Sequence, residues 1–77
     1  MDMTTEERLE TLRLELLQVK TAIAAIQNGA QEYRIGSRSL RKPDLGLLYQ
    51  ERDRLEREID YIERGGTIFR YAIFEGR

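Results

Sequence analysis

The sequence predicts an α+β fold of two antiparallel helices with a short β element between them. Two stretches carry apolar residues at alternating spacings of three and four, which is the period of a helix and not of a strand. A short stretch between them alternates apolar and polar residues around a Gly-Ser pair. The helices have similar lengths and a connection of only about 14 residues, so they should pack antiparallel.

The first helix is expected at about residues 5–28. Thr4 and Glu7 have the spacing of a capping box, in which each side chain accepts a hydrogen bond from a backbone N–H at the helix start. Asn28 and Gly29 form a stop signal, since glycine readily adopts the left-handed conformation that ends helices. The apolar stripe between these signals consists of Leu9, Leu12, Leu16, Val19, Ile23 and Ile26.

The β element is expected at about residues 31–41. Tyr33 and Ile35 alternate with Glu32 and Arg34, which indicates an extended strand over 31–35. The pair at 36–37 is typical of a tight turn. Whether residues 38–41 form a second strand, and so complete a hairpin, stays open at this point.

The second helix is expected at about residues 43–64. Pro43 suits a first helical turn, where its missing N–H costs nothing, and Asp44 suits the positive end of the helix dipole. Gly65 and Gly66 stop the helix. Its stripe repeats the spacing of the first helix and consists of Leu45, Leu48, Arg52, Leu55, Ile59 and Ile62.

Charged residues of the second helix allow two further expectations. Asp53 with Arg57, and Asp60 with Arg64, are favourable pairs one helical turn apart. Arg52 lies within the apolar stripe, where its stem could pack while its guanidinium reaches water. The alternative is a paired, partly buried arginine at a contact between subunits.

The chain therefore divides into a helix–β–helix domain over residues 1–66 and a flexible apolar tail over 67–77. The tail either folds back as a strand beside 31–35 or becomes ordered on a partner. Its candidate partner-binding residues are Ile68, Phe69, Tyr71, Ile73 and Phe74. The expected core of the domain consists of the apolar positions of both stripes and of the strand, namely Leu9, Leu12, Leu16, Val19, Ile23, Ile26, Tyr33, Ile35, Leu45, Leu48, Leu55, Ile59 and Ile62.

Composition argues against catalysis. The 77 residues include no cysteine and no histidine, so thiolate zinc sites, imidazole bases and the common nucleophile pairs are excluded. The second helix carries many carboxylates, but they are expected on a solvated face, with no catalytic or metal site and no cofactor.

The acidic N-terminus is unlike a signal peptide, and no apolar run approaches the roughly 20 residues of a membrane span. We therefore expect neither a membrane nor a small-molecule substrate as partner.

Two surfaces are candidates for binding. Basic residues gather around the turn and could contact phosphates, or could balance the acidic helices as a solvated hairpin; they are Arg34, Arg38, Arg41 and Lys42. Apolar residues also lie off the two stripes and could be scattered exposed side chains or subunit contacts; they are Leu14, Leu17, Leu47 and Tyr61.

The stretch from Gly29 to Leu45, GAQEYRIGSRSLRKPDL, resembles the central motif of gpW-like phage head–tail joining proteins. Tyr33 and Ile35 match that family's apolar pair, residues 36–40 match its turn, and Asp44 with Leu45 match the start of its second helix. The motif covers about 17 residues, and the similarity in architecture extends over about residues 5–64. The family's hydroxyl residue at the second helix cap is replaced here near Arg41 and Lys42.

This resemblance implies a structural role in a phage or prophage. The protein would be a connector subunit that forms a homo-oligomeric ring on the portal, offers the attachment surface for the tail, and is monomeric when isolated. It would reside in the host cytoplasm before assembly and at the head–tail junction of the virion afterwards. There it could also contact DNA in the channel. The tail residues would order on the portal or the next connector protein. The alternatives are a small nucleic-acid-binding module that uses the basic turn 34–42 and a non-phage helical-hairpin interaction protein.

Overall fold

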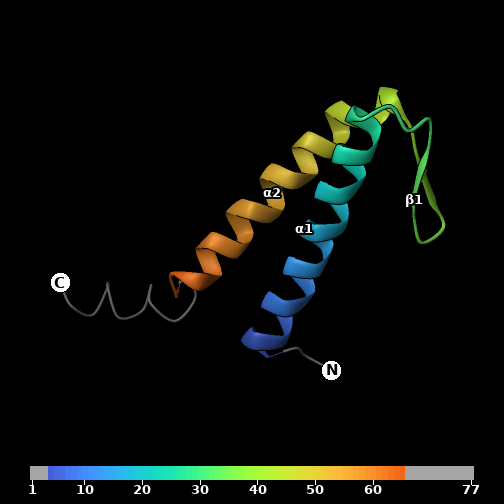
Figure 1. Ribbon diagram of the computed structural model, residues 1–77. Coiled ribbons are helices and arrows are strands. Elements are labelled where there is room, and N and C mark those ends of the chain that lie inside the picture. Colours follow the sequence, from blue (N-terminus) through green and yellow to red (C-terminus); the bar gives the residue numbers. More distant parts are fainter. Residues whose placement is uncertain (1–3, 66–77) are drawn as a thin grey trace.

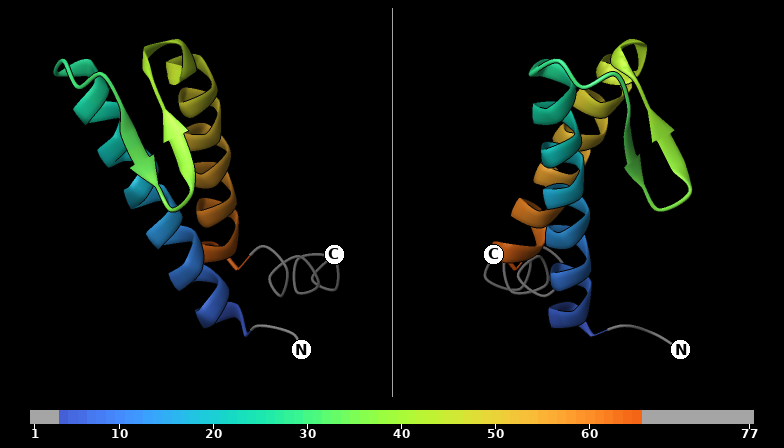
Figure 2. Two further views of the ribbon diagram at one scale, coloured as in Figure 1. Left: turned by 90° about the vertical axis from the view of Figure 1, so that its right-hand side faces the viewer. Right: turned by 45° about the vertical axis from the view of Figure 1, so that its right-hand side comes forward.

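The computed structural model describes residues 4–65, which form two antiparallel helices with a β-hairpin between them (Figure 1). This is the predicted α+β fold. The element order is α1 (Thr5–Gln27), β1 (Tyr33–Ile35), β2 (Arg38–Leu40), the short 3-10 helix η1 (Lys42–Asp44) and α2 (Leu45–Glu63). The hairpin turns back from the end where α1 stops and α2 begins, and runs alongside the helices (Figure 2).

Helix α1 begins and ends at the signals found in the sequence. The Glu7 N–H donates to the Thr4 hydroxyl at 3.1 Å, and the Thr4 N–H donates to the Glu7 carboxylate at 3.0 Å, which completes the capping box. At the other end Gly29 adopts a φ of 107°, and its N–H donates to the carbonyl of Ile26 at 3.1 Å. The left-handed glycine lets the chain leave the helix while still satisfying its last carbonyls.

The β element is a complete two-stranded hairpin, which answers the question left open by the sequence. Tyr33 pairs with Leu40, Arg34 with Ser39 and Ile35 with Arg38. Gly36 has a φ of 61° and Ser37 has no positive φ, as in a type II′ turn, whose twist matches that of paired strands. The strands are shorter than the expected 31–35 and 38–41, because only the residues next to the turn are paired.

Helix α2 starts two residues later than expected, since residues 42–44 form a 3-10 turn before it. The Asp44 N–H donates to the carbonyl of Arg41 at 2.8 Å, three residues back, and the Asp44 carboxylate accepts from the Arg41 N–H at 2.8 Å. Such turns are common at helix starts, and Pro43 fits there without losing a hydrogen bond. Gly65, with a φ of 70°, ends the helix.

The core lies between the two helices and the inner face of the hairpin. Of the predicted core, seven residues are buried, all of them at stripe positions on α1 and α2, and the rest are half-buried against them. Two buried residues were not in the predicted set: Ala22, beside the α1 stripe, and Leu40, on β2. The fully or almost fully buried side chains are Leu12, Val19, Ala22, Ile23, Ile26, Leu40, Leu48, Leu55 and Ile59.

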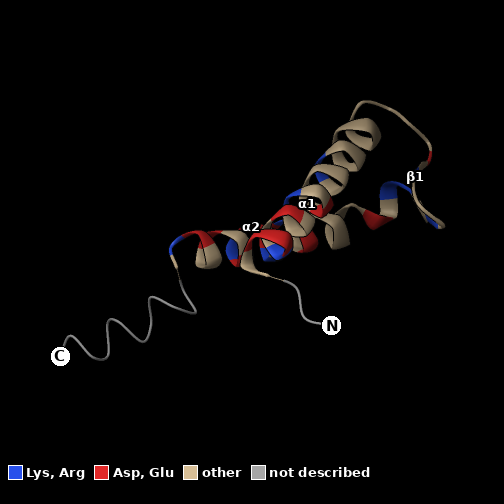
Figure 3. Cartoon of the chain, turned by 90° about the horizontal axis from the view of Figure 1, so that it is seen from below, with Lys and Arg blue, Asp and Glu red and all other residues tan. Residues whose placement is uncertain are grey.

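Ion pairs flank this apolar seam. Arg8 binds Glu58, Arg13 binds Glu63, and the Lys20 ammonium lies 3.6 Å from the Glu56 carboxylate. Along both helices, acidic and basic residues are interspersed (Figure 3). All of these pairs are substantially exposed, so each contributes at most about 1 kcal/mol and helps mainly to set how the helices align.

One of the two pairs expected within α2 forms. Asp60 and Arg64 lie 2.7 Å apart. Asp53 instead contacts its neighbour Arg52 at 3.4 Å, because the Arg52 side chain bends along the helix surface toward it; the expected pair of Asp53 with Arg57 is absent among the described contacts of residues 4–65.

The predicted tail over 67–77 lies outside the described residues, and so do Ile68, Phe69, Tyr71, Ile73 and Phe74.

Candidate interaction surfaces

The hairpin has two chemically different faces, because side chains alternate along each strand. The inner face carries Tyr33, Ile35 and Leu40, which pack against the core, together with Arg38. The outer face carries Arg34 and Ser39. The four basic residues predicted as one cluster are therefore divided between faces, and Arg38 is separated from Arg34.

Arg38 is bound to helix α2. Its guanidinium donates two hydrogen bonds to the Glu51 carboxylate, one of them at 3.0 Å, and both side chains are half-buried. These hydrogen bonds raise the pKa of Arg38 above its ordinary value, against the opposing effect of burial. A two-pronged arginine–carboxylate pair has a defined geometry. Arg38 therefore attaches the hairpin to α2 and is not available as a free phosphate ligand.

Glu32 is the common partner of three polar residues in and next to the hairpin. Its carboxylate accepts a hydrogen bond from the Ser39 hydroxyl and lies 3.4 Å from Arg34 and 3.8 Å from Arg41. The Ser39 hydrogen bond is the largest influence and lowers the pKa of Glu32, desolvation comes next and opposes it, and the two arginines lower it further. The carboxylate partly neutralises the cations that the sequence suggested for phosphate binding.

Lys42 is the remaining member of the predicted basic cluster. It lies exposed in η1 with no ion pair among residues 4–65. Glu32 and Glu51, which bind the three arginines, were not among the predicted site residues. The sequence offered a sign for Glu32, which alternates with Tyr33 in the strand pattern. It offered none for Glu51, because this residue is far from the hairpin along the chain.

The four off-stripe apolar residues all lie on the surface. Leu14 and Leu17 are 59% and 60% exposed, and Leu47 and Tyr61 are 50% and 41% exposed. The two leucines of α1 line a shallow depression together with Glu10, Thr11 and Arg13. Helix α1 thus presents apolar side chains on the face away from its core as well as toward it.

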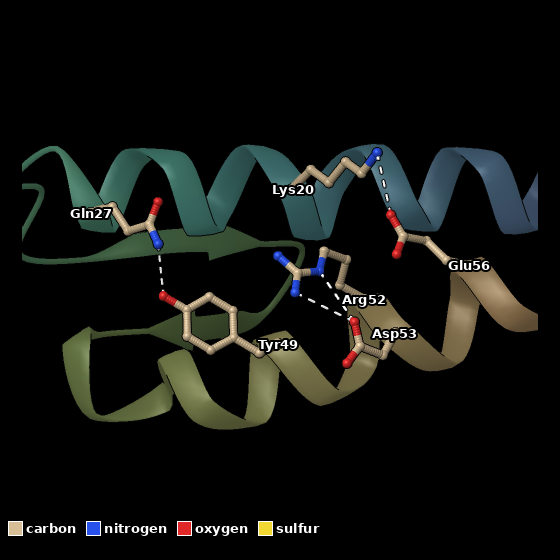
Figure 4. Close-up of polar contacts among 6 residues, drawn as sticks. All are labelled: Lys20, Gln27, Tyr49, Arg52, Asp53 and Glu56. Atoms are coloured by element: carbon tan, nitrogen blue, oxygen red, sulfur yellow. Dashed lines mark hydrogen bonds and ion pairs between the residues drawn. The ribbon is translucent and has the colours of Figure 1, made fainter.

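One polar contact bridges the helices near the connecting end, and nothing in the sequence indicated it (Figure 4). The Gln27 amide of α1 donates to the Tyr49 hydroxyl of α2 at 2.7 Å. The Arg52 guanidinium lies over the Tyr49 ring, 5.3 Å from its centroid, and contacts Asp53 at the surface. The Arg52 side chain is 36% exposed, which agrees with the first of its two expected arrangements, a packed stem with a wet head group; the contact between subunits stays a prediction.

The carboxylates of α2 are used in ion pairs. Glu51, Glu56, Glu58 and Glu63 each contact a cation on another element. Within the part of the chain that the structure describes, no group of acidic residues has an arrangement that could hold a metal ion. In the same part, neither helix is both long and apolar enough to cross a bilayer.

Comparison with known proteins gives one result. No curated protein and no solved structure matches this chain significantly. A family model described as a family of unknown function, DUF6148, matches residues 1–74, which is nearly the whole chain. The chain, with its two helices, its hairpin and its exposed leucines, belongs to the DUF6148 family.

Proposed function

We propose that this protein is a structural connector subunit of a phage or prophage, which assembles on the portal and offers the attachment surface for the tail. The observation that carries the proposal is the complete hairpin, placed between two antiparallel helices at the stretch that resembles gpW-like head–tail joining proteins. The matching apolar pair, Tyr33 and Ile35, faces the core, as a motif that defines the fold requires.

A further observation supports an adaptor over an enzyme. The apolar seam is narrow, yet four large apolar side chains remain exposed on the outer sides of the helices. A small domain of this kind gains stability when it binds partners, since association shifts the folding equilibrium toward the folded state. We propose that the isolated protein is a monomer in the host cytoplasm and forms a ring at the head–tail junction of the virion.

The direct test is co-assembly with a portal protein encoded beside this gene. We expect the full-length chain to co-sediment with purified portal rings and to add a layer of density at one end of the ring in electron micrographs. A portal from an unrelated phage serves as the control. A gene neighbourhood without portal, terminase or tail genes, together with failure to bind any candidate portal, would favour the non-phage interaction protein instead.

Deletion of residues 67–77 separates folding from assembly. We expect the shortened chain to keep its helical circular dichroism, because the helices and the hairpin enclose the core within residues 4–65, and to lose portal binding. A matched variant replaces Ile68, Phe69, Tyr71, Ile73 and Phe74 with serine at full length. Loss of helical structure in either variant would mean that the tail belongs to the core.

The nucleic-acid alternative has weaker support, because three of the four basic residues already pair with carboxylates. Phosphate binding would have to compete with these pairs. If the alternative were correct, the chain would bind duplex DNA with a salt-dependent affinity that the joint change Arg38→Ala and Arg41→Ala removes. Absence of binding at low salt would eliminate it.

A further inference from the structure

A second stripe of residues follows the outer face of α1. Its positions recur at spacings of three and four, so they lie along one line on the helix surface, and every one of them is exposed. The stripe is acidic toward the N-terminus, apolar or small further along, and contains no lysine or arginine. Its residues are Glu7, Glu10, Leu14, Leu17, Thr21 and Ala24.

Helix α2 carries an outer stripe with the same spacing and the opposite charge. It has a leucine near its start, a tyrosine near its end, three arginines, and no acidic residue. All of its positions are exposed. Its residues are Leu47, Gln50, Arg54, Arg57, Tyr61 and Arg64.

The charges of the two stripes are complementary. The α1 stripe carries −2, from Glu7 and Glu10, and the α2 stripe carries +3, from its arginines. Among residues 4–65, Glu10 and Arg57 have no ion-pair partner, whereas Arg54 contacts Glu58 at 3.5 Å and Arg64 contacts Asp60 at 2.7 Å, both carboxylates lying on α2. The two helices of one molecule cannot satisfy these charges on each other, because both stripes face away from the shared core.

We propose that the α1 stripe of one copy docks against the α2 stripe of a second copy of this chain. The helices run antiparallel in this contact, because only that direction brings Glu7 and Glu10 to the end of α2 that holds Arg57 and Arg64. Aligning Glu7 with Arg64 places Ala24 opposite Leu47. The small Ala24 then leaves room for the larger leucine.

The same alignment gives the exposed leucines a partner. Leu14 lies opposite Arg57, and Leu17 lies opposite Arg54. The aliphatic stems of these arginines can cover the leucines. The Arg57 guanidinium then lies beside Glu10, which is one helical turn from Leu14 on the α1 stripe. The contact thus removes apolar surface from water and pairs charges in the same step.

This contact joins two different surfaces, so it is heterologous and can repeat from copy to copy around a ring. The inference rests on the proposed function in one respect, since a connector ring requires a contact between neighbours. Copies held side by side on a portal have a high effective concentration, so a contact that is weak in solution suffices there.

Charge reversal of full-length protein tests the contact without a portal. We expect self-association in sedimentation equilibrium at high protein concentration and low salt, weakened roughly threefold or more by Glu10→Lys alone or Arg57→Glu alone. The double variant Glu10→Lys, Arg57→Glu should restore it, as should an equimolar mixture of the two single variants. Lys42→Glu, which makes the same charge change as Arg57→Glu on a residue outside both stripes, should leave it unchanged.

The apolar part of the contact has its own variant. Leu14→Gln with Leu17→Gln should abolish self-association without changing the helical circular dichroism, since both side chains are exposed. A chain that stays monomeric under all conditions would overturn the proposal, and would fit coverage of the stripe by the chain's own residues 66–77. Association that the single reversals leave unchanged, or that the double variant fails to restore, would overturn it too. Because no portal is present, these outcomes are independent of whether the portal is bound.

Discussion

Arg38 is the residue that most clearly links local sequence to tertiary structure. It belongs to a short strand, yet its two hydrogen bonds go to Glu51 on helix α2. Removing one partner leaves the other half-buried without a counter-ion, which costs more than the pair contributes when it is intact. The pair therefore holds the hairpin in one orientation on the helices.

Replacement of Arg38 by alanine should lower the free energy of unfolding by about 1 kcal/mol, because Glu51 loses both hydrogen bonds. Arg38→Lys should recover only part of this, since lysine cannot make the two-pronged contact. Urea denaturation followed by circular dichroism measures the change. Arg34→Ala is the control, with an expected effect within about 0.5 kcal/mol; an equal loss from both variants would contradict the role assigned to Arg38.

Glu32 makes part of the hairpin's stability depend on pH. Its pKa is lowered from the ordinary value of 4.5, first by the Ser39 hydrogen bond and then by Arg34 and Arg41. A lowered pKa in the folded state means that the stabilisation is present above about pH 4.5 and disappears as the pH falls through the folded-state pKa.

We therefore expect the NMR signals of the hairpin to shift together as acid protonates Glu32. In the variant Ser39→Ala, the measured pKa of Glu32 should move back toward 4.5 because the main hydrogen-bond donor is lost. An unchanged pKa in that variant would show that the arginines control this carboxylate instead.

At the scale of elements, glycines determine where each helix ends and where the hairpin turns. Gly29, Gly36 and Gly65 all have positive φ. A side chain at these positions meets a strained backbone, whether or not there is space for it. The hairpin depends on this most, since its strands have only three residues each.

Gly36→Ala should destabilise the protein by about 1 kcal/mol, because alanine disfavours the left-handed conformation of the turn. There is open space around Gly36, so strain and not a clash is the cause. Gly46→Ala is the matched control: it also has open space, lies in helix α2, and should stabilise the protein by up to about 1 kcal/mol. Thermal unfolding of both variants measures the difference, and equal effects would exclude turn strain as the cause.

At the scale of the whole molecule, a few side chains carry the core. Leu48 and Leu55 are the largest fully buried ones. A domain of this size has a net stability of only about 3–5 kcal/mol, so single losses in the core are serious. The exposed leucines of the outer stripes make no comparable contribution to folding, and they remain available for binding.

Leu48→Ala should therefore cost about 2–5 kcal/mol and leave much of the protein unfolded at 25 °C. Leu17→Ala, the same change on the outer face of α1, should alter the free energy of unfolding by less than about 0.5 kcal/mol. Chemical denaturation with a helical signal compares the two. A large loss from Leu17→Ala would indicate that this leucine is covered in the free protein.

Local signals in the sequence were sufficient for the existence of both helices, the two caps of α1, the glycine stop of α2 and the turn at Gly36. Capping boxes, glycine stops and apolar spacing act over a few residues, so they can be read without knowledge of the fold. The second strand was harder, because a three-residue strand has little periodicity of its own and forms only when its partner is in place. The 3-10 turn at 42–44 likewise depends on how the hairpin enters α2.

The sequence by itself determined the fold class, both helix faces and most of the core, since these follow from residue spacing. Tertiary structure alone decided which charges meet between different elements, whereas the pair of Asp60 with Arg64 followed from helical spacing. Arg38 and Glu51, or Gln27 and Tyr49, come together only when elements distant in the chain pack against each other. It also decided that the basic residues of the hairpin lie on two faces and are largely paired, because side chains alternate across a strand and the neutralising carboxylate for Arg38 comes from another element.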